Sequence, residues 1–394
     1  MAHFLSSQWP RAIINQIKVM TLKTFSPPTC QLPYKRKTNT FSLTDDLIMH
    51  NSLTKFHKLP LITFILTSLF FCTEALAKDI VKNRMLSYNA ELANFHYPFD
   101  VLTFQLSSQK QKLNMRYMDV GKSKEKNQKV AVLLHGKNFS GYYWEDVANL
   151  LVKQGYRVII PDQIGFGKSS KPQHYQYSFT QLALNTQSLL KNIGVKKYKV
   201  IGHSMGGMLA TTLELNDPNV SDLILINPIG LEPYLDYVQI KDPEFFYAME
   251  IKKTEEKIRD YQKANYYDGK WKPEYERLIQ PHIGWLNGPD KALIAWNNAL
   301  TYMPIFAEDI ASKFSKIDVP THLIIGTRDR TGPGRNWKKD GVDHKLGQYQ
   351  HLGKQAAQAI PNATLYELAG LGHMPQIEDY EKFKPVFLKS MRID

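Results

Sequence analysis

Short apolar runs alternate with segments of helical period from residue 99 onward, and this alternation constrains the fold more than any other feature. Runs such as residues 129–134, 198–201 and 322–325 are apolar almost throughout, as in strands buried on both faces of a parallel sheet. Segments with apolar residues at helical spacing separate them. The alternation predicts an α/β fold: a mostly parallel, doubly wound sheet that helices cover on both sides.

The predicted elements follow one another in a regular order. Strands are expected at residues 99–106, 113–120, 129–134, 156–160, 198–201, 223–226, 322–325 and 364–368, the first two forming a β-pair. Helices are expected at residues 144–153, 179–193, 205–215 and 380–389.

One block interrupts the alternation. Residues 231–314 contain no convincing strand and are rich in Tyr, Trp, Phe and charged side chains. We interpret this block as a helical cap inserted after the sixth strand. Its aromatic residues would form a small core and line a substrate pocket below it. The predicted core domain then consists of residues 78–230 and 315–394.

An apolar stretch at residues 59–72 has the character of a leader sequence. It is short for a membrane span, which needs about 20 apolar residues, but it suits the central region of a signal peptide. Lys55 and Lys58 precede it, and Ala75-Leu76-Ala77 matches a small-residue cleavage pattern.

The position of this stretch is unusual, because 48 residues precede Met49. Translation from Met49 gives a signal peptide of normal proportions at residues 49–77, cleaved after Ala77. Residues 1–48 are then a mis-annotated or disordered extension. The protein would be periplasmic or secreted, with no stable membrane span after cleavage. An uncleaved membrane anchor is the alternative.

Composition excludes several classes of partner. The formal net charge is +13, but no arginine-rich stripe or nucleic-acid motif organises it, so nucleic acid is not an expected partner. Both cysteines, Cys30 and Cys72, precede the predicted core, which leaves no disulfide or cysteine-based metal site there. The histidines show no metal spacing, and no metal or cofactor is expected.

The most specific chemical signal is Gly202-His203-Ser204-Met205-Gly206-Gly207, which follows a predicted strand and opens a predicted helix. This is the context of a nucleophile elbow, in which the serine sits on a sharp, strained turn. The flanking residues need minimal side chains, and the G-x-S-x-G spacing supplies them. The turn would expose the hydroxyl at the carboxyl edge of the sheet, where open α/β sheets bind ligands. We therefore predict Ser204 as a nucleophile.

A nucleophilic serine needs a base, and the base needs an orienting acid. The expected chain order on this type of sheet is Ser, acid, His. Asp329 follows the predicted strand at 322–325, and His373 follows the last predicted strand. Both therefore stand at carboxyl ends of strands, and we predict a Ser204–His373–Asp329 catalytic triad.

Acyl transfer also needs two backbone N–H groups aimed at the developing negative charge. One is expected from Met205, directly after the nucleophile. The other is expected from Lys137, in the His135-Gly136-Lys137-Asn138 loop after the third strand. His135 is interpreted as a structural residue of that loop.

Several motifs resemble landmarks of the α/β-hydrolase superfamily, and the resemblance covers roughly residue 99 to the C-terminus. The motifs are LLHG at 133–136, PDQIGFGKSSKP at 161–172, GHSMGG at 202–207, NPIG at 227–230, RDRTGPG at 328–334 and LGHMPQIE at 371–378. The similar branches are esterases, C–C hydrolases, epoxide hydrolases and haloalkane dehalogenases. The last two use an aspartate nucleophile, and Ser204 argues against both.

The resemblance also bears on the choice of acid. The acid that the family can carry at the end of the sixth strand is absent, because Asn227 occupies that turn. This leaves Asp329 as the match. Asp340 and Asp343 are rival acids, but they lie well beyond the strand end, on an expected solvated loop.

Together these features predict a serine hydrolase that cleaves an ester or related acyl bond of an apolar, medium-sized small molecule, a carboxylesterase-like activity. Amide, thioester, lactone and carbon–carbon substrates fit the same machinery. A cofactor-free lyase or perhydrolase on the same triad is one alternative, and a non-catalytic binding protein is another. The sequence indicates neither the substrate nor the oligomeric state.

Overall fold

The computed structural model describes residues 86–393. The predicted extension at 1–48 and signal peptide at 49–77 lie outside the described residues. Within the described part, no helix combines the length and the apolar character that a membrane crossing requires.

Eight strands form one sheet in the order β1-β2-β4-β3-β5-β6-β7-β8. The β1–β2 and β2–β4 pairs are antiparallel, and every other pair is parallel. The strands are β1 (Val101–Ser108), β2 (Gln111–Val120), β3 (Val130–Leu134), β4 (Arg157–Pro161), β5 (Tyr198–His203), β6 (Val220–Ile226), β7 (Thr321–Gly326) and β8 (Ala363–Leu368). The predicted mostly parallel sheet is confirmed.

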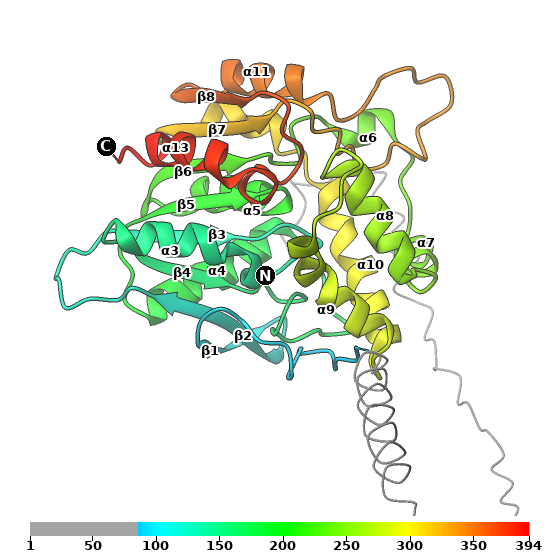
Figure 1. Ribbon diagram of the computed structural model, residues 1–394, viewed down its shortest axis with the longest axis horizontal. Helices are drawn as coiled ribbons and strands as arrows, with labels where there is room; N and C mark the ends of the chain where they lie inside the picture. The colour runs from blue at the N-terminus through cyan, green and yellow to red at the C-terminus, as the bar shows by residue number, and fades with distance from the viewer. Residues whose placement is uncertain (1–85, 394) are drawn as a thin grey trace, which may run out of the picture. The chain divides into compact units, whose positions relative to one another are not determined.

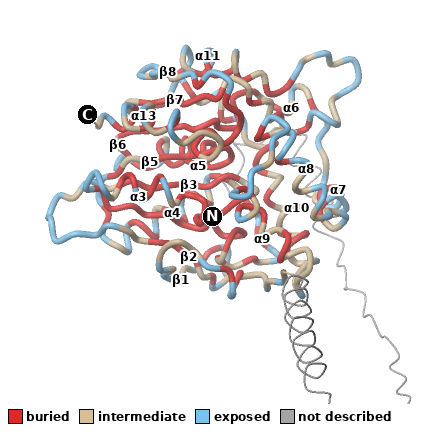
Figure 2. Tube along the Cα trace, viewed as in Figure 1, coloured by how far each residue is buried: buried red, intermediate tan, exposed pale blue. Residues whose placement is uncertain are grey.

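Side chains of the central strands alternate between two buried cores. In β3, Val132 and Leu134 belong to one core, whereas Ala131 and Leu133 belong to the other. Strands β5, β6 and β7 divide in the same way, because successive side chains of a strand point to opposite faces. Figure 2 shows these strands as buried along most of their length. The near-continuous apolar runs in the sequence therefore correspond to strands covered on both faces.

Helices on the two faces supply the partners of these strands. One core contains residues of α4 (Phe179–Asn192), α5 (Met205–Glu214) and α11 (Tyr349–Ala359). The other contains residues of α3 (Glu145–Lys153) and α13 (Tyr380–Ser390). Short turns of helix stand before α3 at η1 (Gly141–Trp144) and before α13 at α12 (Pro375–Glu378). The doubly wound arrangement is confirmed.

The chain between β6 and β7 is helical. It contains α6 (Tyr234–Tyr237), α7 (Pro243–Glu250), α8 (Glu255–Asn265), η2 (Pro273–Tyr275), α9 (Glu276–Leu286), α10 (Lys291–Ala307) and η3 (Ala311–Lys316). Asp242 and Thr254 cap α7 and α8, each accepting a hydrogen bond from a backbone N–H of the first turn. Figure 1 shows α7–α10 grouped along one side of the sheet. Their division from the rest of the chain as a cap stays a prediction.

Candidate active site

Ser204 occupies the turn between β5 and α5, with φ of 56° and ψ of −121°. A non-glycine residue rarely adopts this backbone conformation, which is typical of a strained functional turn. Close packing against neighbouring backbone atoms requires glycine at both flanking positions. A Cβ on Gly202 would lie 2.2 Å from the carbonyl oxygen of Gly206, and one on Gly206 would lie 2.2 Å from that of Leu134. The G-x-S-x-G spacing therefore lets strand, turn and helix pack without a clash.

The structure brings together the three residues of the predicted triad. His373 Nε2 lies 2.9 Å from Ser204 Oγ, and His373 Nδ1 lies 2.7 Å from Asp329 Oδ2. Asp329 comes from the loop after β7, and His373 from the loop after β8. Ser204 is 7% exposed, Asp329 is 0% exposed and His373 is 1% exposed. One continuous line of hydrogen bonds thus runs from hydroxyl to imidazole to carboxylate.

The Asp329 carboxylate is held in its charged form. Burial acts to raise its pKa, but the neighbouring His373 and the hydrogen bonds that the carboxylate accepts outweigh burial and lower the pKa. The backbone N–H of Thr331 donates to Oδ1 at 2.7 Å. The rival acids, Asp340 and Asp343, are exposed on the loop that follows.

Asn227 provides a further contact to this carboxylate. It directly follows β6 and has φ of 38°, and its Nδ2 donates to Asp329 Oδ2 at 2.9 Å. Its Oδ1 accepts the backbone N–H of Gly326 at 2.9 Å, where β7 ends. Sequence reasoning treated Asn227 only as the absence of an acid. The structure shows an amide that joins the ends of two neighbouring strands and holds Asp329 between them.

The two predicted oxyanion donors come from the residue after Ser204 and from the loop that packs against Ser204. Met205 is the first residue of α5, so its N–H has no partner within the helix. Gly136 packs against the nucleophile: a Cβ placed on it would lie 3.1 Å from Ser204 Cβ. Lys137 is the next residue, and its N–H donates no hydrogen bond to another group within residues 86–393. Within residues 86–393 neither amide therefore has an acceptor; Met205 adjoins Ser204 in sequence, and Lys137 follows the glycine that packs against Ser204.

A buried hydrogen-bond network joins the loops around Ser204, and sequence reasoning missed it. The Gly136 N–H donates to Tyr143 Oη at 3.1 Å, and this hydroxyl lies 3.0 Å from His203 Nδ1. His203 Nε2 lies 2.8 Å from the carbonyl oxygen of His373. Burial, with a further contribution from His373, lowers the pKa of His203 to about 3, so its ring is neutral.

These contacts assign the proton positions on His203. Because the His373 carbonyl only accepts, His203 Nε2 carries the hydrogen, and Nδ1 accepts from the Tyr143 hydroxyl. The network therefore links the Gly136 loop, the nucleophile elbow and the His373 loop through neutral groups. The sequence signal that could have found it is the histidine directly before the serine.

Two other polar residues near the site have structural partners. The ring of His135 contacts the Gly136 carbonyl oxygen at 2.9 Å and accepts the Gln163 N–H at 3.1 Å. Asp162 accepts hydrogen bonds from the backbone N–H groups of Gly141 at 2.6 Å and Lys168 at 2.7 Å. These contacts brace the loops after β3 and β4 against each other. Among the described residues, no group of three or more His, Cys, Asp or Glu side chains is arranged to hold a metal ion.

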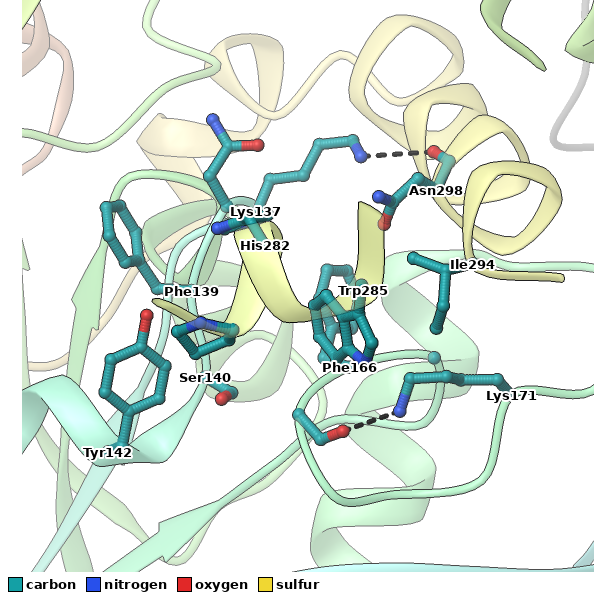
Figure 3. Close-up of a pocket in the computed structure, with 14 residues that line it drawn as sticks. Lys137, Phe139, Ser140, Tyr142, Phe166, Lys171, His282, Trp285, Ile294 and Asn298 are labelled. Carbon is teal, nitrogen blue, oxygen red and sulfur yellow. Dashed lines mark hydrogen bonds between the residues drawn. The ribbon is translucent and has the colours of Figure 1, made fainter. Parts of the chain in front are cut away.

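A narrow pocket opens beside the Gly136 loop, beneath α9 and α10 (Figure 3). Residues 137–140 line it from the loop after β3, and residues 165–167 from the loop after β4. Pro281, His282 and Trp285 line it from α9. The pocket thus begins at the residue next to the glycine that packs against Ser204.

Comparison with known proteins places this chain in a family. Residues 130–258 match the family model described as alpha/beta hydrolase fold. A crystal structure described as a probable hydrolytic enzyme from Pseudomonas aeruginosa PAO1 matches at 43% identity and a TM-score of 0.75. That match covers 78% of this chain and 99% of the other. The chain belongs to the α/β-hydrolase fold family. The resemblance seen in the sequence is thereby confirmed, and the protein is a hydrolase of this family.

More distant α/β-hydrolases match over most of their length. A 2-hydroxy-6-oxononadienedioate/2-hydroxy-6-oxononatrienedioate hydrolase from Pseudomonas putida is 25% identical over 70% of this chain and 91% of its own. The structure of an esterase from Exiguobacterium antarcticum is 18% identical with a TM-score of 0.58, over 74% of this chain and 100% of that one. At this identity the esterase match shows the fold alone.

Proposed function

We propose that this α/β-hydrolase is a serine hydrolase that cleaves an ester or related acyl bond of a medium-sized, largely apolar small molecule, and that it is carboxylesterase-like. The observation that carries the proposal is the line of hydrogen bonds from Ser204 Oγ through the His373 ring to Asp329. Buried, mutually oriented groups of this kind are what nucleophilic catalysis by serine requires.

The geometry supports a two-step mechanism. His373 Nε2 takes the proton of Ser204 as Oγ bonds to the substrate carbonyl carbon, and the carbonyl oxygen becomes an oxyanion. The N–H groups of Met205 and Lys137 would stabilise that charge. The bond to the leaving group then breaks, and His373 donates the proton to the leaving oxygen. Water repeats the sequence on the acyl-enzyme and releases the acid. Asp329 stays ionised throughout, orients the His373 ring and stabilises the imidazolium each time it forms.

A second candidate reaction is hydrolysis of a carbon–carbon bond. One curated relative, from Pseudomonas putida, matches most of this chain. It is named as an oxononadienedioate hydrolase, which belongs to this reaction class. The same three residues would serve, with a carbanion as the leaving group. Ester hydrolysis is the first choice because it needs no group beyond the triad and the two amides.

Covalent labelling and turnover test the proposal. A fluorophosphonate probe should label the protein, and Ser204→Ala should abolish labelling and reduce ester turnover by about 10⁶-fold, because the nucleophile is lost. The matched control is Ser221→Ala, which removes a hydroxyl bonded to the Tyr198 carbonyl oxygen near the start of β6. A folded protein that neither reacts with the probe nor hydrolyses any member of an ester panel would contradict the proposal and favour a non-catalytic role.

A further inference from the structure

A tyrosine of the helical block between β6 and β7 lies directly against the predicted catalytic histidine. Tyr266 follows α8, and its N–H donates to the Gln262 carbonyl oxygen at 2.8 Å. Its ring stacks on the His373 imidazole, with ring centroids 5.0 Å apart and an angle of 30° between the planes. Only 3% of Tyr266 is exposed. The helical block therefore supplies an aromatic cover for the imidazole.

The backbone of Tyr266 also packs against the loop that carries His373. A Cβ placed on Gly372, the residue before the histidine, would lie 2.5 Å from the Tyr266 carbonyl oxygen. A side chain at this position would push the loop after β8 and Tyr266 apart. Glycine at 372 thus allows the close approach that brings the tyrosine ring onto the imidazole.

The hydroxyl of Tyr266 reaches the loop that carries a predicted oxyanion donor. Asn138 Nδ2 donates to Tyr266 Oη at 3.2 Å, and Asn138 directly follows Lys137. Burial, with a smaller contribution from Tyr261, raises the pKa of Tyr266 well above its ordinary value, so the hydroxyl stays protonated. Tyr266 therefore contacts both the loop of the predicted base and the loop of a predicted oxyanion donor.

The hydrogen bonds of the His373 ring do not hold its plane through the whole reaction. At rest, Nδ1 is bonded to Asp329 Oδ2 at 2.7 Å and Nε2 to Ser204 Oγ at 2.9 Å. In the proposed mechanism, Nε2 leaves Ser204 and turns to the leaving group, so only the bond at Nδ1 remains. Rotation of a histidine ring about its Cβ–Cγ bond has a broad energy minimum, and one hydrogen bond fixes it poorly. A flat ring stacked on the imidazole restricts this rotation.

Stacking also suits the charged form of the base. His373 becomes an imidazolium when it takes the serine proton, and a cation within about 6 Å of an aromatic face is attracted by the ring quadrupole. The Tyr266 ring lies within this range, at 5.0 Å. An aliphatic side chain of similar size would cover the imidazole, but it would supply neither the flat surface nor the quadrupole.

We propose that Tyr266 is a positioning residue for the triad: its ring holds the plane of the His373 imidazole while Nε2 carries the proton from Ser204 to the leaving group. The inference rests on the proposed serine hydrolase activity and adds a residue of the helical block to its machinery. The hydrogen bond from Asn138 keeps the tyrosine ring in place.

The test removes the ring and then restores it. Tyr266→Leu keeps a buried apolar side chain without a flat ring, whereas Tyr266→Phe keeps the ring without the hydroxyl. The readouts are the rate of fluorophosphonate labelling, and kcat and KM for p-nitrophenyl butyrate. We expect Tyr266→Leu to lower the labelling rate and kcat by about 10- to 100-fold with little change in KM, because a misplaced base slows proton transfer. Tyr266→Phe should restore both to within about threefold of the parent, because only one ordinary hydrogen bond is lost.

The matched control is Tyr275→Leu. Tyr275 is another buried tyrosine of the helical block, 1% exposed, and its ring stacks on Tyr267 with the centroids 3.7 Å apart. This variant should lose a similar free energy of unfolding in denaturant and keep the kcat of the parent. Equal kcat in Tyr266→Leu and Tyr275→Leu would overturn the inference. So would a raised KM with unchanged kcat in Tyr266→Leu, since Tyr266 would then contact only the substrate.

Nuclear magnetic resonance separates this inference from the proposed function, because it needs no substrate. The Asp329 carboxylate only accepts, so His373 Nδ1 carries the hydrogen of their bond. In protein with isotope-labelled histidine, this proton is identified as the signal that His373→Gln lacks. We expect the signal in the parent and in Tyr266→Phe, and its loss through ring motion and exchange with water in Tyr266→Leu.

The two hypotheses can then fail separately. If the parent protein shows neither fluorophosphonate labelling nor turnover of any ester, the proposed function fails, and the Nδ1 signal alone still tests whether Tyr266 holds the ring. If Tyr266→Leu is folded by circular dichroism and keeps this signal unchanged, the positioning role is wrong, whatever the activity of the parent.

Discussion

At the scale of single residues, Asn227 is a hydrogen-bond partner of the predicted acid, Asp329. A turn that lacks the family's alternative carboxylate instead carries an amide, which donates to Asp329 and accepts from the end of β7. An amide can do both at once because it carries a donor and an acceptor, whereas an ionised carboxylate only accepts. We therefore expect Asn227 to act as a positioning residue for Asp329.

Replacing this amide by a carboxylate tests the role. In Asn227→Asp, a second negative charge close to Asp329 should raise the pKa of Asp329, because like charges disfavour ionisation. Below its pKa, protonated Asp329 no longer stabilises the imidazolium, so the acid limb of kcat/KM should move to higher pH by about one unit. The pH–rate profile measures this shift.

The matched control for this substitution is Asn219→Asp. Asn219 also lies beside an aspartate, with its Nδ2 2.7 Å from Asp217 Oδ1, but it stands just before β6 and away from the triad. Its pH–rate profile should match that of the parent. An unmoved acid limb in Asn227→Asp would argue against the positioning role.

At the scale of elements, the loops at the carboxyl ends of β3, β5 and β8 are tied into one unit. The Tyr143 hydroxyl, from η1, accepts a hydrogen bond from the Gly136 N–H and donates one to the neutral His203 ring. That ring in turn donates a hydrogen bond to the His373 carbonyl oxygen. All of these groups are buried, so each hydrogen bond lost would leave an unpaired polar atom. The network thus fixes the distances between the nucleophile, the base and the Lys137 amide.

Removing the Tyr143 hydroxyl should disturb this unit. In Tyr143→Phe, the Gly136 N–H and His203 Nδ1 lose their partner, which should lower the free energy of unfolding by about 1–3 kcal/mol. It should also lower kcat by about tenfold or more with little change in KM, because the oxyanion donor shifts relative to Ser204. Denaturant unfolding and steady-state kinetics measure the two effects.

Tyr175→Phe is the matched control for the loss of a buried hydroxyl. The Tyr175 hydroxyl contacts Ser108 Oγ at 2.7 Å and accepts the Asn185 amide at 3.0 Å, between β1 and α4. This variant should lose similar stability and retain kcat. If Tyr143→Phe and Tyr175→Phe had the same kcat and KM, the role of Tyr143 would be purely structural.

At the scale of the whole molecule, the first described segment ties the helical block to the sheet. The Tyr88 N–H donates to the Gly284 carbonyl oxygen at 2.9 Å, and a Cβ on Gly288 would lie 1.9 Å from the Tyr88 carbonyl oxygen. Leu92 is fully buried, and the Tyr97 hydroxyl donates to Asp162 Oδ2 at 2.7 Å. A mature chain must therefore keep this segment, and cleavage after Ala77 leaves it intact.

Cleavage of the N-terminal segment is also predicted at the scale of the whole molecule. We expect the exported protein to begin at Lys78, because a signal peptidase would cut after the small-residue motif that ends at Ala77. N-terminal sequencing of the protein from the periplasm or medium measures this. Recovery in a membrane fraction with residues 59–72 still attached would favour the uncleaved anchor instead.

The sequence alone predicted the sheet, because strands buried on both faces are apolar runs that need no knowledge of their partners. The boundaries were less certain: β6 begins three residues before the run predicted at 223–226, and α11, a helix with several polar residues, was not predicted. The three triad residues could also be named, since the end of each strand leads to the same edge of the sheet.

Only the tertiary structure showed how the remaining residues act. Asn227, Tyr143 and His203 gain their roles from loops that are distant in sequence, and no local pattern records which atoms will meet. Lys137 is the clearest case. Its position after β3 indicated a backbone donor, whereas the desolvation of its ammonium beneath α10 exists only once the helices pack over it. Local spacing thus predicted Ser204 as a nucleophile, and packing decided the electrostatics of the pocket beside it.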